Sequence, residues 1–258
     1  MPDPVPSPGV TGLQRLAARS WRGLEEERYG DWLLRAGGGF TGRANSVLVV
    51  GDPADDLTTA VATVARWYDQ RGLKPRAQVP MPGSEDADAA LAAAGWTRDD
   101  DNLVLTAQLA GWPVPAVGVD LAPEPDDAWL AGYLYRGTPL PPVAHDVLIN
   151  AENPVFAAVR CEPEPAPLAA VARGVLVEGW LCVTAVTVDE RYRRRGLATA
   201  VMAGLGAWAR ARGAHSCVLQ VAGANAPALA LYERLGFTEH HRYHYRLGGG
   251  RDRGPSPA

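Results

Sequence analysis

The sequence predicts an α/β (α+β) fold built from two related units. Three observations support this prediction. Apolar runs typical of buried strands alternate with Ala- and Leu-rich segments that end at a glycine. An internal repeat relates the two halves of the chain. In the second half, a turn containing three arginines and a glycine joins a predicted strand to a predicted helix.

The second half has the clearer elements. Strands are predicted where apolar residues run together or alternate with polar ones, and helices where Ala and Leu recur up to a closing glycine. Pro227 lies in the first turn of the last helix, where proline is tolerated. In order, we predict a short strand at 117–121, helices at 126–135 and 142–149, a hairpin of strands 168–177 and 180–188, a helix at 197–212, a strand at 215–221 and a helix at 226–235.

The first half repeats this order in shortened form. Residues 57–72 align without a gap with 198–213, which pairs Trp67 with Trp208. Residues 87–95 then match 228–236, and strands are predicted ahead of these helices at 31–36 and 43–50. Any two α/β segments share periodicity, but the matched tryptophan and glycine positions favour common descent. We therefore predict a truncated unit at 1–115, a complete unit at 116–247 and a disordered tail at 248–258, with residues 1–9 also mobile.

The arginine–glycine turn is predicted to bind an anion. Arg193, Arg194, Arg195 and Gly196 precede a helix whose first backbone N–H groups and dipole favour negative charge, most naturally a phosphate or pyrophosphate. Two alternatives for the arginines are a solvated surface and a nucleic-acid patch. The turn matches neither the Gly-x-Gly-x-x-Gly nor the Gly-Lys-Ser/Thr nucleotide pattern.

A second motif makes the anion site more specific. Asn225, Tyr232, Gly236 and Phe237 follow the pattern Asn-x6-Tyr-x3-Gly-Phe, and the turn reads Arg-x-x-Gly-x-Ala. With this pair of motifs, residues 116–247 resemble the GNAT N-acetyltransferase superfamily, in which tandem arrangements occur. The resemblance implies a mixed, mostly antiparallel central sheet flanked by helices, and acetyl-CoA (coenzyme A) as co-substrate without a metal.

The resemblance also implies how each motif residue acts. Tyr232 would protonate the leaving thiolate after direct attack by an amine, and a backbone N–H, that of Val188, would stabilise the oxyanion. Since a tyrosine has a pKa of about 10 and a thiol of about 8.5, Tyr232 would act through a positioned hydrogen bond. Asn225 would bind the pantetheine arm or simply cap its helix. The backbone of Val186, Thr187 and Val188 would pair with that arm, and the pyrophosphate would lie on the amides of Arg194, Arg195, Gly196, Leu197, Ala198 and Thr199, with Arg193 adding charge.

The sequence identifies neither the general base nor the acceptor amine. Gln220 stands where some relatives that acetylate protein N-termini carry a glutamate, and a glutamine cannot serve as a base. Glu178 and Asp189 fit turns better, and Glu152 and His145 are weak candidates; a water chain or an amine that binds neutral would replace them. The helices at 126–135 and 142–149, with Trp129, Tyr133, Tyr135 and His145, are expected to shape the acceptor site, which Phe40 and Arg43 would also reach. A small-molecule amine, a peptide N-terminus and a protein lysine all fit.

The first unit lacks every residue of this chemistry. Its corresponding loop, 51–56, carries three acids, which would repel a pyrophosphate. Ser84 replaces Asn225, and Leu91 replaces Tyr232. We therefore predict that the first unit binds no acetyl-CoA and is structural or forms one wall of the acceptor site.

Composition narrows the class of protein. The net charge of −4 disfavours nucleic-acid binding, and we see no apolar run that could cross a membrane and no signal peptide. Cys161, Cys182 and Cys217 fall on predicted strands without metal or disulfide spacing, which favours a cytoplasmic protein. Lys74 is the only lysine, a bias typical of a GC-rich bacterial genome. The protein could form a homodimer. Two alternative functions remain, a non-catalytic acyl-CoA-binding module and a nucleic-acid-binding protein.

Overall fold

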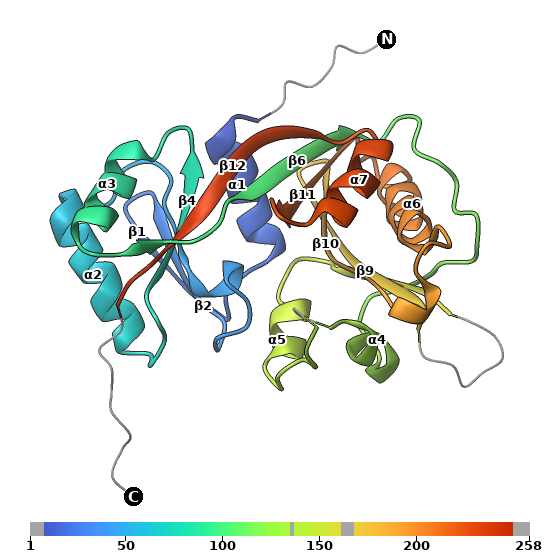
Figure 1. Cartoon of the computed structure of the whole chain (residues 1–258), viewed down its shortest axis with the longest axis horizontal. Helices are drawn as coiled ribbons and strands as arrows, with labels where there is room; N and C mark the ends of the chain where they lie inside the picture. The colour runs from blue at the N-terminus through green and yellow to red at the C-terminus, as the bar shows by residue number, and fades with distance from the viewer. Residues whose placement is uncertain (1–7, 135–136, 161–167, 250–258) are drawn as a thin grey trace, which may run out of the picture.

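One continuous twisted sheet of twelve strands runs through the whole protein (Figure 1). The computed structural model describes residues 8–134, 137–160 and 168–249. The strand order is β1-β2-β3-β4-β12-β6-β11-β10-β9-β8-β7, with β5 beside β12. The strands are β1 (Glu25–Tyr29), β2 (Trp32–Ala36), β3 (Val47–Leu48), β4 (Arg76–Met81), β5 (Thr97–Arg98), β6 (Asn102–Gln108), β7 (Asp120–Ala122), β8 (Val155–Val159), β9 (Ala170–Val177), β10 (Trp180–Val188), β11 (Ser216–Ala222) and β12 (Thr238–Leu247).

The sheet is mixed and mostly antiparallel, as predicted. Within the described part of the chain, the parallel neighbours are β3 with β4 and β10 with β11. Each of these pairs is joined by a helical crossover, as parallel strands require. The helices are α1 (Val10–Ser20), α2 (Leu57–Asp69), α3 (Glu85–Ala93), α4 (Asp127–Gly132), α5 (Ala144–Ile149), α6 (Leu197–Arg210) and α7 (Ala226–Arg234), with short 3₁₀ turns η1 (Arg43–Asn45) and η2 (Glu190–Tyr192).

The two halves exchange strands at the centre of the sheet. Strand β6 belongs to the first half of the chain but lies between β11 and β12, with Leu105 opposite Leu219. Strand β12 ends the second half but lies between β4 and β6, with Tyr245 opposite Gln78. Each half therefore completes the other's part of the sheet. The division of the chain at residue 115 remains a prediction.

Helices α2, α3, α6 and α7 cover one face of the sheet. Successive strand residues point to opposite faces, and Cys217, Leu219 and Val221 of β11 pack with α6 residues in one core cluster. Tyr232 of α7 belongs to the same cluster. In the first half, α2 and α3 pack on the inward residues of β2, β3 and β4.

The opposite face is covered by α1, α4 and α5. Leu13 and Leu16 of α1 pack on Val218, the β11 residue that points away from α6. Gln14 anchors α1 through hydrogen bonds of 2.8 Å with Gln78 of β4 and His241 of β12. Helix α1 thus sits over the line where the two halves meet, and α4 and α5 continue this layer over β8 and β9.

Most predicted elements of the second half are confirmed. Strand 180–188 is β10, and the neighbouring elements start or end within a few residues of their predicted bounds. The short strand predicted at 117–121 instead covers Asp120–Ala122. Cys182 and Cys217 are buried on β10 and β11. Tyr135, Cys161 and the outer parts of both tails lie outside the described residues.

One prediction for the first half is wrong. Strand 43–50 shrinks to β3 (Val47–Leu48), because the chain first makes the turn η1. The Asn45 side chain holds that turn: its oxygen accepts from the backbone N–H groups of Gly37 and Gly39, and its amide donates to the Thr41 carbonyl. These bonds satisfy backbone groups that a strand would have paired. The turn brings Arg43 toward the second half.

Candidate active site

The turn before α6 presents backbone N–H groups to open space. Gly196 has φ of 76°, in the left-handed region, and Arg194 has φ of 65°. The first hydrogen bond of the helix runs from the Ala200 N–H to the Gly196 carbonyl, so the amides of residues 197–199 lie ahead of it. A Cβ placed on Gly196 would meet no atom within 4 Å. The geometry fits the predicted anion site.

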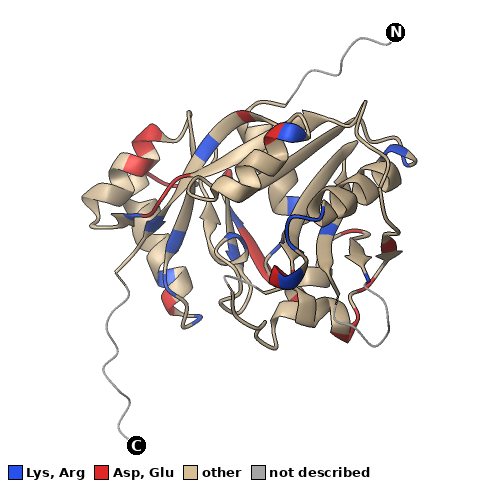
Figure 2. Cartoon of the chain, turned by 45° about the vertical axis from the view of Figure 1, so that its right-hand side comes forward, with Lys and Arg blue, Asp and Glu red and all other residues tan. Residues whose placement is uncertain are grey.

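The arginines of this turn are not all neutralised. Arg193 pairs with Glu190 at 3.1 Å, and Arg191 pairs with Asp189. Arg195 stacks over the Tyr192 ring at 5.4 Å. Within the described residues, no carboxylate pairs with Arg194 or Arg195, so the turn keeps positive charge beside its free amides. Figure 2 shows that acidic and basic residues are otherwise spread over both halves of the molecule.

Strands β10 and β11 come apart next to this turn. They pair in parallel from Trp180 opposite Ser216 to Val183 opposite Leu219, and the pairing ends there. Strand β10 continues on β9 through a bulge between Thr184 and Thr187, with Ala185 at φ of 57°. The backbone edge of 186–188 that faces β11 is therefore left without a strand partner. These are the three residues predicted to pair with the pantetheine arm.

Helix α7 begins at Asn225 and carries Tyr232. The Asn225 side chain accepts a hydrogen bond of 3.2 Å from the Ala228 N–H, so its capping role is realised. Tyr232 is buried on the α6 side of the sheet, with its ring 5.6 Å from that of Phe237. Burial, with a smaller contribution from Cys217, raises the pKa of Tyr232 to about 12. The hydroxyl is therefore protonated at neutral pH.

A second group of side chains meets the opening from the α1 side. Alternation along β11 points Gln220 to this face, and its Oε1 accepts from the Tyr243 hydroxyl at 3.3 Å. The same oxygen lies 3.5 Å from Nη1 of Arg43, which comes from η1 in the first half. The Arg43 guanidinium lies 4.9 Å from the centre of the Trp21 ring. The first half thus contributes side chains beside Gln220.

Arg173 of β9 adds buried positive charge on this face. Its Nε donates to the Leu148 carbonyl at 2.7 Å and its Nη1 to the Ser20 carbonyl at 2.8 Å. Nη2 has no partner among the residues that the structure describes. Burial, and then the nearby charge of Arg43, lowers the pKa of Arg173 to about 9. Its guanidinium lies 5.1 Å from the centre of the Trp21 ring.

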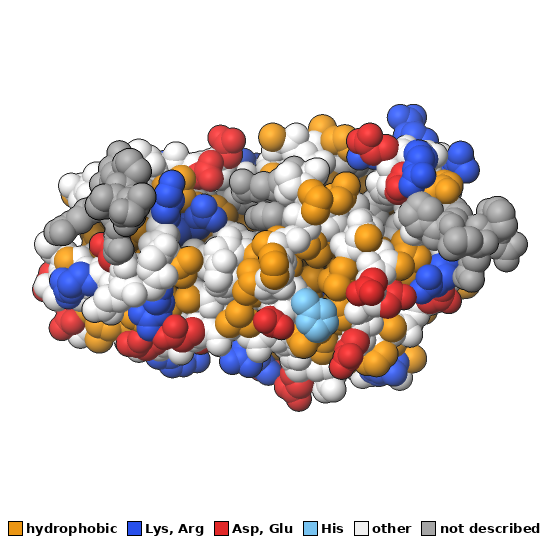
Figure 3. All heavy atoms as spheres, turned by 90° about the horizontal axis from the view of Figure 1, so that it is seen from below, with side chains coloured by type: hydrophobic (Ala, Val, Ile, Leu, Met, Phe, Trp, Pro, Cys, Tyr) orange, Lys and Arg blue, Asp and Glu red, His pale blue; other side chains and the backbone are white. Residues whose placement is uncertain are grey.

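The three acids and the histidine considered as bases lie elsewhere. Glu178 pairs with Arg19, and Glu152 lines a pocket along α1. Asp189 is held by Arg191, whose side chain lowers its pKa to about 2. His145 lines a pocket with apolar residues of α4, α5 and the segment between them. Figure 3 shows hydrophobic side chains gathered on one face of the molecule. No contact among the described residues links these groups to Tyr232 or Gln220.

The predicted acceptor helices form an apolar wall. Trp129 of α4 is buried and donates to the Ala157 carbonyl at 3.0 Å, and Tyr133 packs on its ring. Phe40 and Trp21 from the first half pack in the same cluster, with ring centres 6.4 Å apart. Trp129 and Tyr133 are therefore core residues, while Phe40 belongs to the junction of the two halves.

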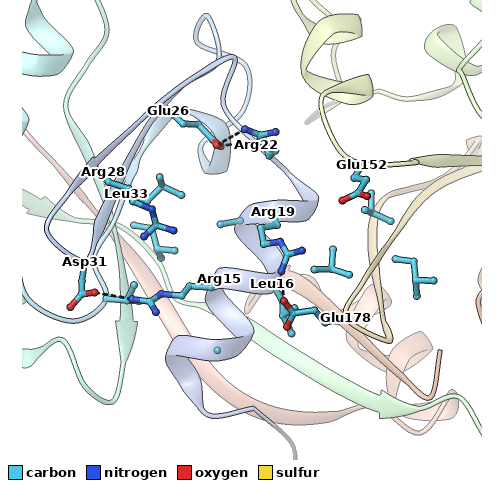
Figure 4. A pocket seen from close by; sticks show the side chains of 17 residues that line it. Arg15, Leu16, Arg19, Arg22, Glu26, Arg28, Asp31, Leu33, Glu152 and Glu178 are labelled. Atoms are coloured by element: carbon cyan, nitrogen blue, oxygen red, sulfur yellow. Dashed lines mark hydrogen bonds and ion pairs between the residues drawn. The ribbon is translucent and has the colours of Figure 1, made fainter. Parts of the chain in front are cut away.

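A larger pocket of about 750 Å³ runs along α1 (Figure 4). Its charged side chains are largely paired with one another: Arg15 with Asp31, Arg19 with Glu178, and Arg22 with Glu26. None of the residues around it belongs to the α6 turn or to α7. This pocket is distinct from the opening between β10 and β11.

In the corresponding region of the first half, side chains of the protein bind the backbone. The Val49 N–H donates to the Gln78 carbonyl at 3.0 Å, the bond that completes the last ladder pair, Leu48 with Gln78. Ser84, aligned with Asn225, donates its hydroxyl to the Val49 carbonyl at 2.9 Å. The carboxylate of Asp56 accepts from the Thr59 N–H at the start of α2. The protein's own side chains thus occupy both features that are open in the second half.

Sequence reasoning overlooked Arg173 and Trp21. An arginine inside the apolar run Ala170–Val177 is a recognisable signal, because charged residues are rarely placed in a buried strand without a purpose. Trp21 follows an amphipathic segment and offers no such signal. Within the described residues, no helix is long and apolar enough to cross a membrane, and no cluster of three metal-ligating side chains occurs.

The chain resembles known acetyltransferases over nearly its whole length. The family described as "Probable histone acetyltransferase Rv0428c C-terminal" matches residues 9–246. The uncharacterized N-acetyltransferase YobR of Bacillus subtilis is 26% identical over 92% of this chain and 98% of its own. The probable histone acetyltransferase Rv0428c of Mycobacterium tuberculosis is 28% identical over 94% of this chain and 75% of its own.

Solved structures share the fold. A GCN5-related N-acetyltransferase from Kribbella flavida superposes with a TM-score of 0.65 at 18% identity, covering 95% of this chain and 97% of that protein. The match to residues 9–246 spans both halves and both faces of the β10–β11 opening. The chain is therefore a GNAT-type acyltransferase that belongs to the Rv0428c C-terminal family of acetyltransferases.

Proposed function

We propose that this protein transfers the acetyl group of acetyl-CoA to an amine, and that the donor binds where β10 and β11 separate. The observation that carries the proposal is the end of strand pairing at Val183 and Leu219, beside both the α6 turn and α7. An extended pantetheine arm would take the vacated strand position on residues 186–188. In the first half, the side chains of Ser84 and Asp56 bind the backbone at the corresponding places, so we assign it no donor site.

The residues present fit the donor. The amides of residues 194–199 and the charge of Arg193, Arg194 and Arg195 would receive the pyrophosphate. Asn225 would hydrogen-bond the pantetheine arm while its side chain caps α7. Gly196 leaves the approach to the amides free of side-chain atoms.

The chemistry needs an acid on one side of the opening and a place for the acceptor on the other. The amine nitrogen forms a bond to the acetyl carbon, the carbon–sulfur bond breaks, and one proton leaves the nitrogen while another reaches the sulfur. Tyr232 would donate the proton to sulfur from the α6 side. The Val188 N–H would donate to the developing oxyanion.

The acceptor would enter from the α1 side. Gln220, Arg43 and Trp21 meet the opening there, so the first half would form one wall of the acceptor site. The positive charge of Arg43 and Arg173 disfavours an ammonium ion nearby and so favours the neutral, nucleophilic amine. Its proton would leave through water, since Gln220 cannot accept it.

A pair of glycine variants tests the donor site. Gly196→Glu puts a carboxylate on the α6 amides and should weaken acetyl-CoA binding at least about 100-fold, or about 2.7 kcal/mol. Gly213→Glu is the matched control: Gly213 also has a positive φ, 84°, and also has open space around a new Cβ, but lies at the other end of α6.

Binding is measured by calorimetry, and thiol release follows turnover with a panel of amines. Unchanged affinity in Gly196→Glu, or equal losses in both variants, would refute the donor site. Absence of thiol release with every class of amine would argue against the transfer reaction.

A further inference from the structure

Positive charge without a counter-ion collects where the two halves meet. Arg35 donates to the Ser46 carbonyl and, at 2.8 Å, to Gln78 Oε1. Arg43 reaches Gln220, and Arg173 reaches backbone carbonyls. Within the described residues, all these acceptors are neutral, whereas the half-buried Arg246 of β12 pairs with Asp88.

This arrangement costs folding free energy. A guanidinium stays charged when buried, and burial without a carboxylate leaves its desolvation uncompensated. Arg173 is wholly buried, and one of its nitrogens has no acceptor among the described residues. An anion arriving next to these groups would offset part of that cost.

Arg43 is the member of the group that a ligand can reach. It is only half-buried, and its 3.5 Å contact with Gln220 lies at the limit of a hydrogen bond, so it is easily exchanged for a better acceptor. Arg173 is fully covered and acts through its charge. Both lie on the α1 side of the β10–β11 opening, the side opposite Tyr232.

We propose that the acceptor carries an anionic group, a carboxylate or a phosphate, beside its amine, and that Arg43 pairs with this group. The proposal rests on the proposed acetyl transfer and names the substrate class of the same site. A guanidinium and a carboxylate or phosphate form two parallel hydrogen bonds, which would also orient the amine. A lysine-rich peptide would be repelled by the same charge.

A set of matched amines tests whether the protein prefers an acceptor that carries an anionic group. We would compare β-alanine, 2-aminoethyl phosphate, the uncharged analogue β-alaninamide and a lysine-rich peptide, using kcat/KM from thiol release. The anionic amines should exceed β-alaninamide at least about tenfold, equivalent to about 1.4 kcal/mol. The carboxylate and phosphate arms distinguish the two anions.

Variants of Arg43 then test whether this residue causes the preference for anionic amines. Arg43→Gln should bring the ratio of anionic to neutral amine close to one, and Arg43→Lys should restore part of it because the charge is kept. Arg66→Gln is the control, since Arg66 lies on α2 and bonds to Thr63. Melting temperatures and acetyl-CoA affinity are measured for each variant to confirm folding and an intact donor site.

Two results would overturn the proposal: equal use of neutral and anionic amines, or preference for the lysine-rich peptide, by the unmodified protein. A ratio unchanged in Arg43→Gln would remove Arg43 from the site. If no amine is acetylated, the transfer reaction fails separately. Binding of the same compounds to the coenzyme A complex, measured by calorimetry, then decides whether Arg43 selects an anion.

Discussion

Burial sets the protonation state of Tyr232. The pKa of its hydroxyl rises to about 12 because the phenolate would lose its hydration, and the neighbouring Cys217 adds to the rise. Arg43 acts in the opposite direction from the α1 side of the sheet. The hydroxyl therefore stays protonated up to about pH 11, and no alkaline loss of activity below that value should come from Tyr232.

Removing this hydroxyl should slow the reaction without unseating the donor. Tyr232→Phe keeps the ring packed on Phe237, so acetyl-CoA affinity should change less than about threefold. We expect kcat to fall about 100-fold or more, as general acids contribute 10²–10⁴. Steady-state thiol release and calorimetry give the two quantities.

Tyr68→Phe provides the comparison for this prediction. Tyr68 is another buried tyrosine, in the first half, and its hydroxyl donates to the Arg35 carbonyl. It should cost about 1 kcal/mol of stability and leave kcat intact. A Tyr232→Phe enzyme with full kcat would exclude Tyr232 as the acid.

The sequence predicts which residues of the proposed donor site lie together, but it does not predict this for the residues on the acceptor side. Asn225 and Tyr232 lie seven residues apart on one helix, so their spacing already places them together. Arg43 and Gln220 lie 177 residues apart, and only the exchange of strands brings them within 3.5 Å.

At the scale of elements, helices α2 and α6 share a tryptophan–arginine contact near their C-terminal ends but differ at their N-termini. Both carry a tryptophan covered by the arginine four residues later: Arg71 lies 3.5 Å from the Trp67 ring and Arg212 lies 4.7 Å from the Trp208 ring. At its N-terminus, α2 is capped by Asp56, while α6 starts at a bare glycine. We expect this difference at the start of the two helices to decide whether an anion binds there.

An ion pair between Asp88 and Arg246 links helix α3 to the exchanged strand β12. Asp88 accepts from Arg246 at 2.7 Å and contacts His244 at the same distance. The hydrogen bond from Arg246, and to a smaller extent that from His244, lowers the pKa of Asp88 from its ordinary 3.8 to about 2. A lowered carboxyl pKa means that the folded state favours the ionised form, so this contribution is present above about pH 4 and is lost as the pH falls toward 2.

Asp88→Asn should therefore destabilise the protein at neutral pH. We expect a loss of about 1 kcal/mol in the free energy of unfolding after allowing for solvent screening. The difference from the unmodified protein should shrink between pH 4 and pH 2.5, as followed by urea unfolding. Asp86→Asn, an exposed acid in the same helical turn, controls for the helix dipole. A difference that does not depend on pH would contradict the ion-pair explanation.

At the scale of the whole molecule, the two halves are interlocked. Strand β6 supplies β11 and β12 with a partner, and β12 supplies β4 with one. The apolar residues of β6 also belong to the core under α6, with Leu103 and Leu105 among them. The core under α6 therefore contains residues of both halves.

A fragment covering residues 116–258 should therefore fail to fold alone. Without β6, β11 loses its neighbour and becomes an exposed, apolar edge prone to association. We expect no cooperative thermal transition by circular dichroism and no acetyl-CoA binding. Co-expression with residues 1–115 should restore both. A fragment that melts cooperatively and binds acetyl-CoA by itself would show that the second half is an independent domain.

By itself, the sequence determined the helices and strands of the second half, the arginine–glycine turn that we propose binds an anion, and the place of Asn225 and Tyr232 on one helix, because local periodicity and short spacing encode them. It also indicated that the loop at 51–56 cannot take a phosphate, since like charges repel. The tertiary structure alone decided which strands neighbour each other. Backbone hydrogen bonding is alike for many strand pairs, so the exchange of β6 and β12 leaves no local mark in the sequence. That exchange places Arg43 of one half beside Gln220 of the other, and with it the charge that we propose selects the acceptor.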